Sequence, residues 1–535
     1  MSSVLDLSRA GDSNNLAGSV KEIAVDPRLD GDRLVTAVRD SDGELKLIVW
    51  QISPSGAVTR LGDSRSQGGT ASSISIARGR KYVTAVRDSG GNLKLVSWDI
   101  SSTGTVTKRG DSGSQAGTAS LIRIVAIPTS PDLFVTASQT AAKTLKLTTW
   151  RVAQDGSIMR LDDSRTADGG VSEIALLVDV RSRLVTAVRD SNGNLKLIAW
   201  QIDAVGAVSR LADSEDKAGG ATLIRAVKDS AGNIVTSVRD NDGDLKLITW
   251  RIGTVSSGQV VVRDLNDSGD QAGAIRDNAL VAHSDGVLSA VRDSDGDLKL
   301  IAWSTSPTIM RRSDSAGQAG EAALVNAVPS DGATDSVGRS VSTITAVRDS
   351  DGDLLLITWS PTCLRLHFKI LTAPTESTST MLAAMRQVYA TVGISVQLAS
   401  TEILNIPTLE DLDASDDEGG IAKTDEVKEL FTNRNNVQDG EIVVYFVRTT
   451  TPPENGIAFG RVQGSEPGAV VTSNATRWTL GHEVGHLLLG PDHVRNTDHL
   501  MTGAGTGNIT NPPPDLVAAE ASTMQGNSLT RACGG

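Results

Sequence analysis

Hydrophobic and polar positions alternate in a phrase that recurs through the first two thirds of the chain. In its first copy, LVTAVRDSDGELKLIVW at residues 34–50, two alternating runs rich in β-branched residues flank an Asp-Gly pair. Runs of this kind around such a pair predict a β-hairpin with a tight turn. Further copies are found at residues 82–98, 184–200, 234–250, 288–303 and 344–359, and a degraded copy is found at 134–150.

Two more apolar runs complete each repeat. A run such as GAVTRLGDS (56–64) follows the hairpin, and a run such as SSISIA (72–77) precedes the next one. Four antiparallel strands repeated seven times predict an all-β, seven-bladed β-propeller. Each copy ends in a tryptophan, and these recur about every fifty residues: Trp50, Trp98, Trp150, Trp200, Trp250, Trp303 and Trp359.

The two ends of the repeat region complement each other. The GAVTRLGDS-like run follows the first six of these tryptophans but not Trp359, and a matching run, VLDLSRAGDS, is found at residues 4–13. A ring of blades needs its last blade to be completed by a strand from the start of the chain. We therefore expect a propeller over residues 1–360 that is closed by the N-terminal strand 4–13.

The hairpin phrase resembles the repeats of bacterial tectonin-like and lectin propellers, over the hairpin alone. This resemblance implies a glycan or protein ligand for the propeller. A tryptophan that stacks on sugars is one interpretation of the repeat, but its place within a strand favours a role in the core or between blades. The acidic turns, such as Asp293-Ser294-Asp295-Gly296-Asp297, suggest calcium, yet they lack the spacing of an EF-hand loop and favour a hairpin turn.

A different pattern begins after Trp359. Alternating or apolar runs predict strands at residues 363–371, 394–400, 441–450, 456–462 and 468–474. A helix capped by Ser377 or Thr378 is predicted through residue 393, and a second helix is predicted from an N-cap at Asn474. The acidic stretch 409–420 is interpreted as a solvated loop rather than a calcium site. We therefore expect a second domain of α/β (α+β) type over residues 361–535.

The second predicted helix carries a candidate zinc site in HEVGHLLLGPDH (482–493). Residues four apart lie on one face of a helix, so His482 and His486 present two imidazoles to one point. Neutral imidazole suits Zn²⁺, which lowers the pKa of a bound water to about 7. Glu483 lies beside that face and would act as a general base toward such a water.

The motif HExxHxxxGxxH resembles the HExxHxxGxxH pattern of metzincin metallopeptidases, with one additional residue before Gly490. The resemblance extends over most of residues 363–525 and implies a metzincin-like metalloprotease domain. It implies His493 as the third ligand, with Asp492 and His499 as alternatives, and Met501 as the methionine beneath the metal. It also implies that Gly456, Ile457 and Ala458 form an edge strand that binds a peptide. A gluzincin arrangement would instead require Glu520 as a ligand.

Composition narrows the remaining possibilities. A length of 535 residues predicts more than one domain. A net charge of −13 argues against a nucleic-acid partner, and no apolar run is long enough for a membrane span. The segment MSSVLDLSRAGDS lacks the features of a signal peptide. We therefore expect an extracellular protein that is exported by a non-classical route, with a cytoplasmic location as the alternative. Cys363 and Cys533 form either one disulfide or two free thiols.

These features lead to one function and one alternative. The first is a zinc-dependent endopeptidase that hydrolyses peptide bonds, with a propeller that binds a partner or the protein substrate. The alternative is a propeller-based binding or adhesion protein, lectin-like in character, whose zinc domain is structural or processes only itself.

Overall fold

The computed structural model describes most of the chain, namely residues 7–14, 16–53, 55–164, 169–179, 183–203, 205–215, 218–254, 259–283, 286–315, 319–330, 343–415, 424–460 and 467–532. The chain divides into two compact units. One runs from Arg9 to Ser360, and the other contains the residues from Pro361 onward. The last tryptophan of the repeat, Trp359, immediately precedes this division.

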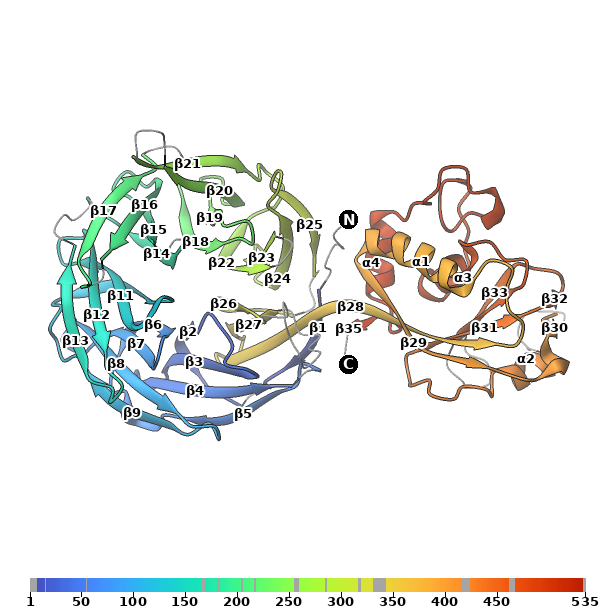
Figure 1. Ribbon diagram of the computed structural model, residues 1–535, viewed down its shortest axis with the longest axis horizontal. Helices are drawn as coiled ribbons and strands as arrows, with labels where there is room; N and C mark the ends of the chain where they lie inside the picture. The colour runs from blue at the N-terminus through green and yellow to red at the C-terminus, as the bar shows by residue number, and fades with distance from the viewer. Residues whose placement is uncertain are drawn as a thin grey trace. The chain divides into compact units, whose positions relative to one another are not determined.

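The first unit is a β-propeller, with its strands arranged as a ring of sheets around a centre (Figure 1). The innermost strands are β2 (Val20–Val25), β6 (Ser72–Arg78), β10 (Ala119–Ile127), β14 (Glu173–Val178), β18 (Thr222–Lys228), β22 (Ile275–His283) and β26 (Ala323–Pro329). The predicted hairpins supply the next strands, β3 (Arg33–Asp40), β7 (Tyr82–Arg87), β11 (Ser130–Thr140), β15 (Leu184–Arg189), β19 (Ile234–Arg239), β23 (Gly286–Asp293) and β27 (Thr343–Arg348).

The second strands of the hairpins carry the tryptophans and are β4 (Leu45–Ile52), β8 (Leu93–Ile100), β12 (Leu145–Val152), β16 (Leu195–Ile202), β20 (Leu245–Thr254), β24 (Leu298–Ser304) and β28 (Leu354–Ile370). The outermost strands are β5 (Val58–Asp63), β9 (Val106–Asp111), β13 (Ile158–Asp163), β17 (Val208–Asp213), β21 (Val260–Asp267), β25 (Met310–Asp314) and β1 (Leu7–Asp12). Six of these groups are separate antiparallel four-stranded sheets. The last group, β26, β27, β28 and β1, belongs to a nine-stranded sheet.

Each tryptophan of the repeat is buried inside its blade. The seven side chains are at most 2% exposed, so they contribute to the core and present no face to a sugar. In six blades the indole N–H donates to a threonine hydroxyl on the neighbouring strand at 2.9 or 3.0 Å, as in the Trp50–Thr36 pair. A buried indole N–H requires such a partner. The repeated threonine therefore serves as the hydrogen-bond partner of the repeated tryptophan.

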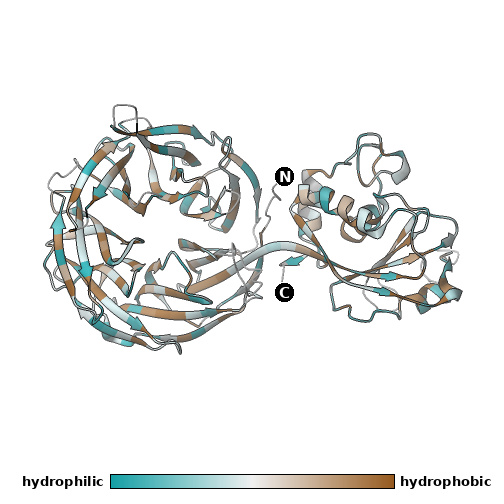
Figure 2. Ribbon diagram, in the orientation of Figure 1, coloured by the Kyte–Doolittle hydropathy of each residue, from teal (hydrophilic) through white to brown (hydrophobic). Residues whose placement is uncertain are grey.

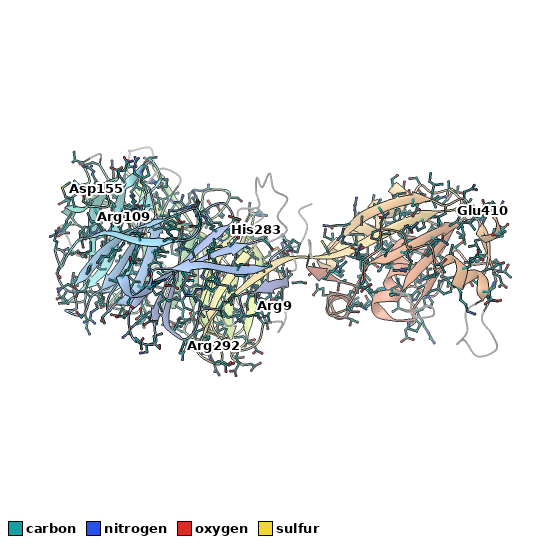
Figure 3. All side chains as sticks on the ribbon, turned by 90° about the horizontal axis from the view of Figure 1, so that it is seen from below. Arg9, Arg109, Asp155, His283, Arg292 and Glu410 are labelled. Carbon is teal, nitrogen blue, oxygen red and sulfur yellow. The ribbon has the colours of Figure 1, made fainter. Side chains whose placement is uncertain are left out.

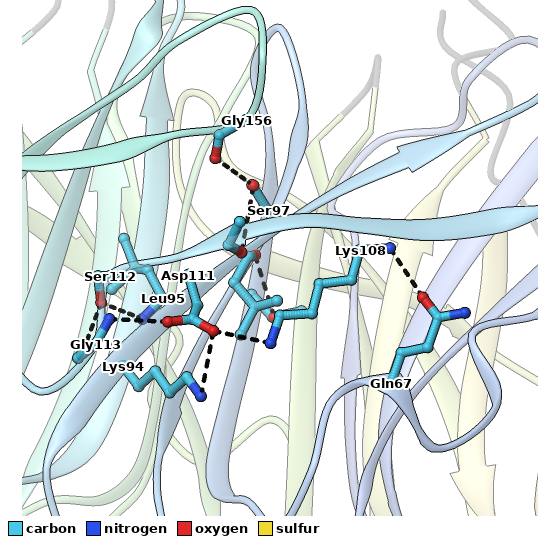
Figure 4. A network of polar contacts seen from close by, with 12 residues as sticks. Gln67, Lys94, Leu95, Ser97, Lys108, Asp111, Ser112, Gly113 and Gly156 are labelled. Carbon is cyan, nitrogen blue, oxygen red and sulfur yellow. Dashed lines mark hydrogen bonds and ion pairs between the residues drawn. The ribbon is translucent and has the colours of Figure 1, made fainter.

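A serine after each outer strand makes a second repeated contact. Its hydroxyl oxygen accepts a hydrogen bond from a leucine N–H at 2.9 to 3.1 Å in six blades, as Ser112 does from Leu95 (Figure 4). The same view shows Ser97 donating to the carbonyl oxygen of Gly156 in the following blade at 2.6 Å. These contacts explain why the sequence repeats the dipeptide Asp-Ser as well as the hairpin.

Strand β1 pairs with β28, as the match between the two ends of the repeat predicts. The hydroxyl oxygen of Ser13 accepts a hydrogen bond from the N–H of Leu356 at 2.9 Å, and the N–H of Ser13 donates to the carbonyl oxygen of Leu356 at 2.9 Å. The first of these is the contact made by the repeated serine in the six four-stranded sheets. Residues 4–6 of the predicted closing strand lie outside the described residues.

The second unit contains a mixed sheet. The second half of β28 pairs in parallel with β29 (Ile394–Ile403) and β31 (Ile442–Val447), and β31 pairs in parallel with β34 (Gly468–Thr472). The strand β33 (Gly456–Phe459) is antiparallel to β34. The shorter strands are β30 (Asp411–Asp413), β32 (Thr449–Thr451) and β35 (Arg531–Ala532), and the helices are α1 (Thr378–Tyr389), α2 (Asp425–Leu430), α3 (Thr479–Leu489) and α4 (Ala518–Gln525).

Alternation along β28 explains how this sheet is covered. Leu364, Leu366 and Phe368 are buried in one cluster with Met385 of α1 and Leu480 of α3, so this face packs against the helices. Hydrophobic residues run along the strands and helices of the unit (Figure 2). Charged residues of the propeller such as Arg109 and Asp155 are exposed (Figure 3).

The structure confirms the predicted cap of one helix and places the start of another differently. The hydroxyl oxygen of Ser377 accepts from the N–H of Thr380 and caps α1, as predicted. Asn474 does not cap α3, because residues 475–478 first form a turn and the helix begins at Thr479. Cys363 is disulfide-bonded, and the other cysteine of the sequence, Cys533, lies outside the described residues. Among the helices of the described residues, none is long and apolar enough to cross a membrane.

Candidate metal site

Helix α3 presents the first two histidines of the motif on one face. Its buried residues include Leu480, Val484 and Leu488, which belong to the same cluster as β28 and α1. Tyr389 of α1 also donates a hydrogen bond to the carbonyl oxygen of Gly481 at 2.9 Å. The helix is therefore fixed by its apolar side, while His482 and His486 project from the other side into a cleft.

Three imidazoles converge at this point. The Nε2 atom of His486 lies 3.1 Å from that of His482 and 3.1 Å from that of His493, and the Nε2 atoms of His482 and His493 are 3.3 Å apart. Zinc held tetrahedrally with Zn–N bonds of 2.0–2.1 Å would place such nitrogens about 3.3 Å apart. Within the described residues, these three histidines form the only group with the spacing of a metal site.

The outer nitrogens of two of the rings are held by backbone carbonyl groups. His482 Nδ1 lies 2.7 Å from the carbonyl oxygen of Leu500, and His486 Nδ1 lies 2.9 Å from that of Gly490. A carbonyl oxygen only accepts, so both Nδ1 atoms must carry the proton. The Nε2 atoms then have lone pairs that point toward one another, an arrangement that repels unless a cation lies between them.

Burial favours the neutral form of His482 and His486. It lowers the pKa of His482 to about 4, and it also lowers the pKa of His486. The neighbouring histidines act in the same direction, because a second positive charge nearby would be unfavourable. Neutral imidazole is the form that binds a metal, so the rings fit a zinc ion at neutral pH.

Glu483 lies next to this cluster and close to β33. Burial raises its pKa to about 8, and the nearby Glu454 adds to this effect, while a hydrogen bond from the N–H of Ala458 opposes it. A side chain at Gly456 would put its Cβ 2.5 Å from Glu483 Cγ, so this position leaves room only for glycine. Gly456, Ile457 and Ala458 line the same cleft, whose volume is about 860 Å³.

Met501 packs against the helix that carries His482 and His486. The side chain is 1% exposed. A Cβ on Gly485 would lie 2.5 Å from the sulfur atom of Met501, so the methionine packs directly on the helix between the two histidines. The predicted role of Met501 as a hydrophobic floor is compatible with this position.

The additional residue of the motif is accommodated at Gly490. This residue ends α3 with φ 101° and ψ −179°, a conformation that only glycine adopts easily. The turn brings His493 back toward His482 and His486. The carbonyl oxygen of Gly490 itself contacts Nδ1 of His486. The carbonyl groups of Gly490 and Leu500 were not predicted from the sequence, since backbone partners leave no residue-type signal.

The alternative ligands are placed elsewhere. Asp492 is exposed and does not belong to the histidine cluster. His499 Nδ1 accepts from the N–H of Met501 at 3.1 Å, and its Nε2 lies 2.8 Å from Glu520. His499 and Glu520 therefore satisfy each other, and the gluzincin arrangement that would need Glu520 as a ligand does not form.

The acidic turns of the repeat use their oxygens internally. The Asp293 carboxylate accepts hydrogen bonds from the N–H groups of Asp295, Gly296 and Asp297 at 3.0 to 3.1 Å, and its other oxygen lies 3.6 Å from Lys299. The corresponding Asp40 makes similar contacts with the turn and with Lys46. This geometry supports the hairpin-turn interpretation of these residues.

The propeller also has a charged cleft that the sequence analysis did not identify. Its volume is about 500 Å³, and its lining includes Arg28, Arg78, Arg80, Lys81 and Tyr82. The signal was available in the repeat, because the second copy reads GRKYV where the first reads GDRLV. Tyr82 takes the place of the leucine that pairs with the repeat tryptophan in the first blade.

No family model and no curated protein matches the chain. The chain is similar to solved structures of Sqt1 from Chaetomium thermophilum, at 13% identity over 65% of this chain and 83% of that one, with a TM-score of 0.40. Sqt1 bound to the N-terminus of the ribosomal protein L10 matches at 14% identity over 65% and 89%, with a TM-score of 0.40. A protein from Lactobacillus plantarum matches at 12% identity over 63% and 94%, with a TM-score of 0.39.

These comparisons correct the predicted activity. The prediction of a metzincin-like zinc metalloendopeptidase is contradicted, because the matches are to structures such as Sqt1 and none of the three named is described as a metallopeptidase. The physical reason is that HExxH is short: it places two imidazoles and a carboxylate on one helix wherever it occurs, without specifying a hydrolase. Accordingly, we assign no catalytic step to Glu483 and no substrate contact to Gly456, Ile457 or Ala458.

Proposed function

We propose that this chain is a propeller-based binding protein for an acidic protein partner, and that its second domain holds a zinc ion. The observation that carries the first part is the charged cleft of the propeller. Four cationic side chains line it, on a chain whose net charge is −13. A local positive surface on an acidic protein attracts acidic partners and keeps basic ones away.

Two of the cationic groups are already neutralised. Arg78 Nη1 lies 2.8 Å from Asp30, and its Nε lies 3.5 Å from Asp26. Lys81 lies 2.5 Å from Asp99. These pairs fix the walls of the cleft, and Arg78 also lies over the ring of Tyr82, 5.8 Å from its centroid.

The other two cationic groups are available to a partner. Arg28 and Arg80 are exposed, and neither forms an ion pair within the described residues. The Arg28 side chain donates to the carbonyl oxygen of Arg78 at 2.8 Å, and its backbone N–H and its charge also act on the carboxyl group of Asp26. Arginine binds carboxylates through two parallel hydrogen bonds, so these two side chains suit aspartate or glutamate residues of a bound segment.

Sqt1, to which this chain is similar, is bound to the N-terminus of a ribosomal protein in one of the solved structures. Binding of a peptide segment is thus compatible with the shared fold. For this chain, the charged cleft supports peptide binding. The buried tryptophans give no support to a glycan ligand.

The experiment is selection of a displayed random peptide library on the full chain. We expect acidic peptides to be enriched, and we expect the double substitution Arg28→Gln and Arg80→Gln to weaken their binding at least tenfold. Arg263→Gln is the matched control, because Arg263 is an exposed arginine that does not line the cleft. Enrichment of peptides that bind the double variant as tightly as the wild type would contradict the proposal.

The second part of the proposal is a zinc site made by His482, His486 and His493. It is supported by the three Nε2 distances of 3.1 to 3.3 Å together with the two Nδ1 contacts to carbonyl groups. Bound zinc would join α3 to the segment that follows Gly490, and a partner or water would complete its coordination from the cleft. Its role is to stabilise this segment, since a ligand that binds only the folded state adds to the free energy of unfolding.

Measurement of the zinc content tests the proposed zinc site. We expect about one zinc per chain by elemental mass spectrometry of the wild type, and little in the double variant His482→Ala and His486→Ala. His283→Ala, in the propeller, is the control. Chelation should lower the melting temperature of the wild type and leave that of the double variant unchanged. Stoichiometric zinc in the double variant would disprove the site.

We further infer that β26, β27, the first part of β28 and β1 act as a seventh blade. The Ser13–Leu356 hydrogen bond of 2.9 Å supports this, because the other six blades each have the equivalent bond. Ser13→Ala should therefore lower the free energy of unfolding by about 1 kcal/mol, as Ser64→Ala should. Urea denaturation measures both variants. A lower free energy of unfolding in Ser64→Ala but not in Ser13→Ala would contradict this inference.

A further inference from the structure

The innermost strands of the propeller share one register position. It lies opposite an alanine or serine of the neighbouring strand, and its occupants are Ala24, Ser75, Arg123, Ala175, Arg225, Ala279 and Asn326. Five of these residues are small or neutral. The two arginines stand on β10 and β18, and the strand between them, β14, has only an alanine at this position. The repeat therefore places two cations near each other around the centre of the ring.

Three acidic residues lie nearby, and each binds the following blade. Glu22 accepts from the N–H of Ile74 at 3.2 Å, Glu173 accepts from that of Ile224 at 2.9 Å, and Asp277 accepts from that of Val325 at 2.9 Å. The second oxygens of two of them are also engaged. Glu22 lies 3.4 Å from Arg39, and Asp277 lies 3.4 Å from Arg225. These carboxylates hold the blades together.

Arg123 has no comparable partner. Within the described residues it forms no ion pair, and its one hydrogen bond goes from Nη1 to the backbone carbonyl oxygen of Ile122 at 2.9 Å. Burial, together with the charge of Arg225, lowers its pKa to about 10, while the more distant carboxylates of Glu173 and Glu22 act in the opposite direction. Arg123 is half-buried, and a guanidinium group that has lost part of its water is costly unless an anion or hydrogen-bond acceptors meet its remaining N–H groups.

A cavity of about 290 Å³ lies beside this side chain. Six of the innermost strands contribute to its lining, and its charged members are Arg123, Arg225 and the carboxylate of Asp277 that pairs with Arg225. A water molecule occupies about 30 Å³ in the liquid, so the cavity has room for a small ion with part of its hydration shell. The charged cleft of the propeller has a different lining, so the two sites are distinct.

We propose that the centre of the propeller is an oxyanion-binding site, in which Arg123 and Arg225 bind a phosphate ion or the carboxylate of an acidic side chain. Arg123 supplies the guanidinium group that lacks an anion, and it can bind two oxygens at once through adjacent N–H groups. Arg225 remains paired with Asp277 and contributes through its charge.

Calorimetric titration of the full chain tests this with three probes: inorganic phosphate, N-acetylglutamate amide and the neutral N-acetylglutamine amide. We expect saturable binding of at least one of the two anions below about 10 mM, which corresponds to a binding free energy of roughly −3 kcal/mol or better. The neutral probe should not bind. Binding of phosphate alone identifies a free ion as the ligand, whereas binding of N-acetylglutamate amide identifies an acidic side chain of a partner.

Substitutions connect the binding to the site. Arg123→Gln should weaken it at least tenfold, and Arg123→Lys should restore part of it, because the charge returns without the paired N–H groups. The control is Arg151→Gln, since Arg151 belongs to the same blade but is 42% exposed and pairs with Asp132 at 3.6 Å. Absence of saturable binding to the wild type, or equal binding to Arg123→Gln, overturns the proposal. The double substitution Arg28→Gln and Arg80→Gln should leave this binding unchanged, which separates it from the proposed function.

Discussion

His486 Nδ1 lies 2.9 Å from the carbonyl oxygen of Gly490, the residue that ends the same helix. One glycine therefore stops α3, turns the chain toward His493 and fixes the ring of His486. This relationship explains how a motif with one additional residue still brings three imidazoles together.

The substitution Gly490→Ala should weaken zinc binding. At φ 101° and ψ −179° an alanine costs about 1–3 kcal/mol, although a Cβ at this position meets no atom within 4 Å. Relief of that strain would rotate the carbonyl group away from His486. We expect zinc affinity, measured by competition with a chelating dye, to fall about tenfold or more. Gly507→Ala, at an unstrained position in the same domain, should leave the affinity unchanged.

The contact between Gly485 and Met501 gives a second prediction. Gly485→Ala would place a Cβ 2.5 Å from the methionine sulfur, so it should lower the melting temperature even though alanine favours helix by about 1 kcal/mol. Gly481→Ala, one turn earlier in the helix, places its Cβ no closer than 3.6 Å to another atom and should be neutral or stabilising. Equal effects of the two substitutions on thermal unfolding would contradict this packing.

The sixth blade lacks one hydrogen bond that the other blades have. Its tryptophan, Trp303, and the serine in place of the usual threonine, Ser289, are buried, and the indole N–H and the hydroxyl have no partner. Ser289→Thr should fix the hydroxyl rotamer and complete the pair, adding about 1 kcal/mol to the free energy of unfolding. The reverse change in the fourth blade, Thr186→Ser, should cost a similar amount. Urea denaturation measures both, and a destabilising Ser289→Thr would refute the interpretation.

Asp26 gives a pH dependence. Burial raises its pKa to about 7, against the opposing charge of Arg78. The folded state therefore holds a proton that the unfolded state releases near pH 4, so this group stabilises the fold at low pH. Its contribution declines as pH rises from about 4 to about 7 and is constant above that.

Asp26→Asn should accordingly be more stable than the wild type above pH 7, by at most about 4 kcal/mol. The gain is an upper limit because the substitution also removes one ion-pair partner of Arg78. Near pH 4 the two proteins should differ little. Asp42→Asn, at an exposed position of the first hairpin turn, is the control. Denaturation curves at pH 5 and pH 8 provide the measurement, and a pH-independent difference would rule out Asp26 as the source.

The regular parts of the fold could be predicted from residue patterns because their causes are local. Alternation around an Asp-Gly pair specifies a hairpin wherever it occurs, and the phrase VLDLSRAGDS identifies its partner by its likeness to the outer strands. The start of α3 was predicted wrongly at Asn474, since a turn competes with the helix over the next four residues. The activity was also predicted wrongly, because a short motif specifies which side chains meet and not which function they serve.

The sequence by itself determined the strands, the order of the blades and the pair His482 and His486, because these follow from spacings of two, four and about fifty residues. Only the tertiary structure decided that His493, and not Asp492 or His499, joins that pair. It also brought Arg28 and Arg80 to one cleft, and Arg123 and Arg225 to one cavity. The physical reason is that these contacts join residues of different blades or depend on backbone carbonyl groups, and neither leaves a periodic pattern along the chain.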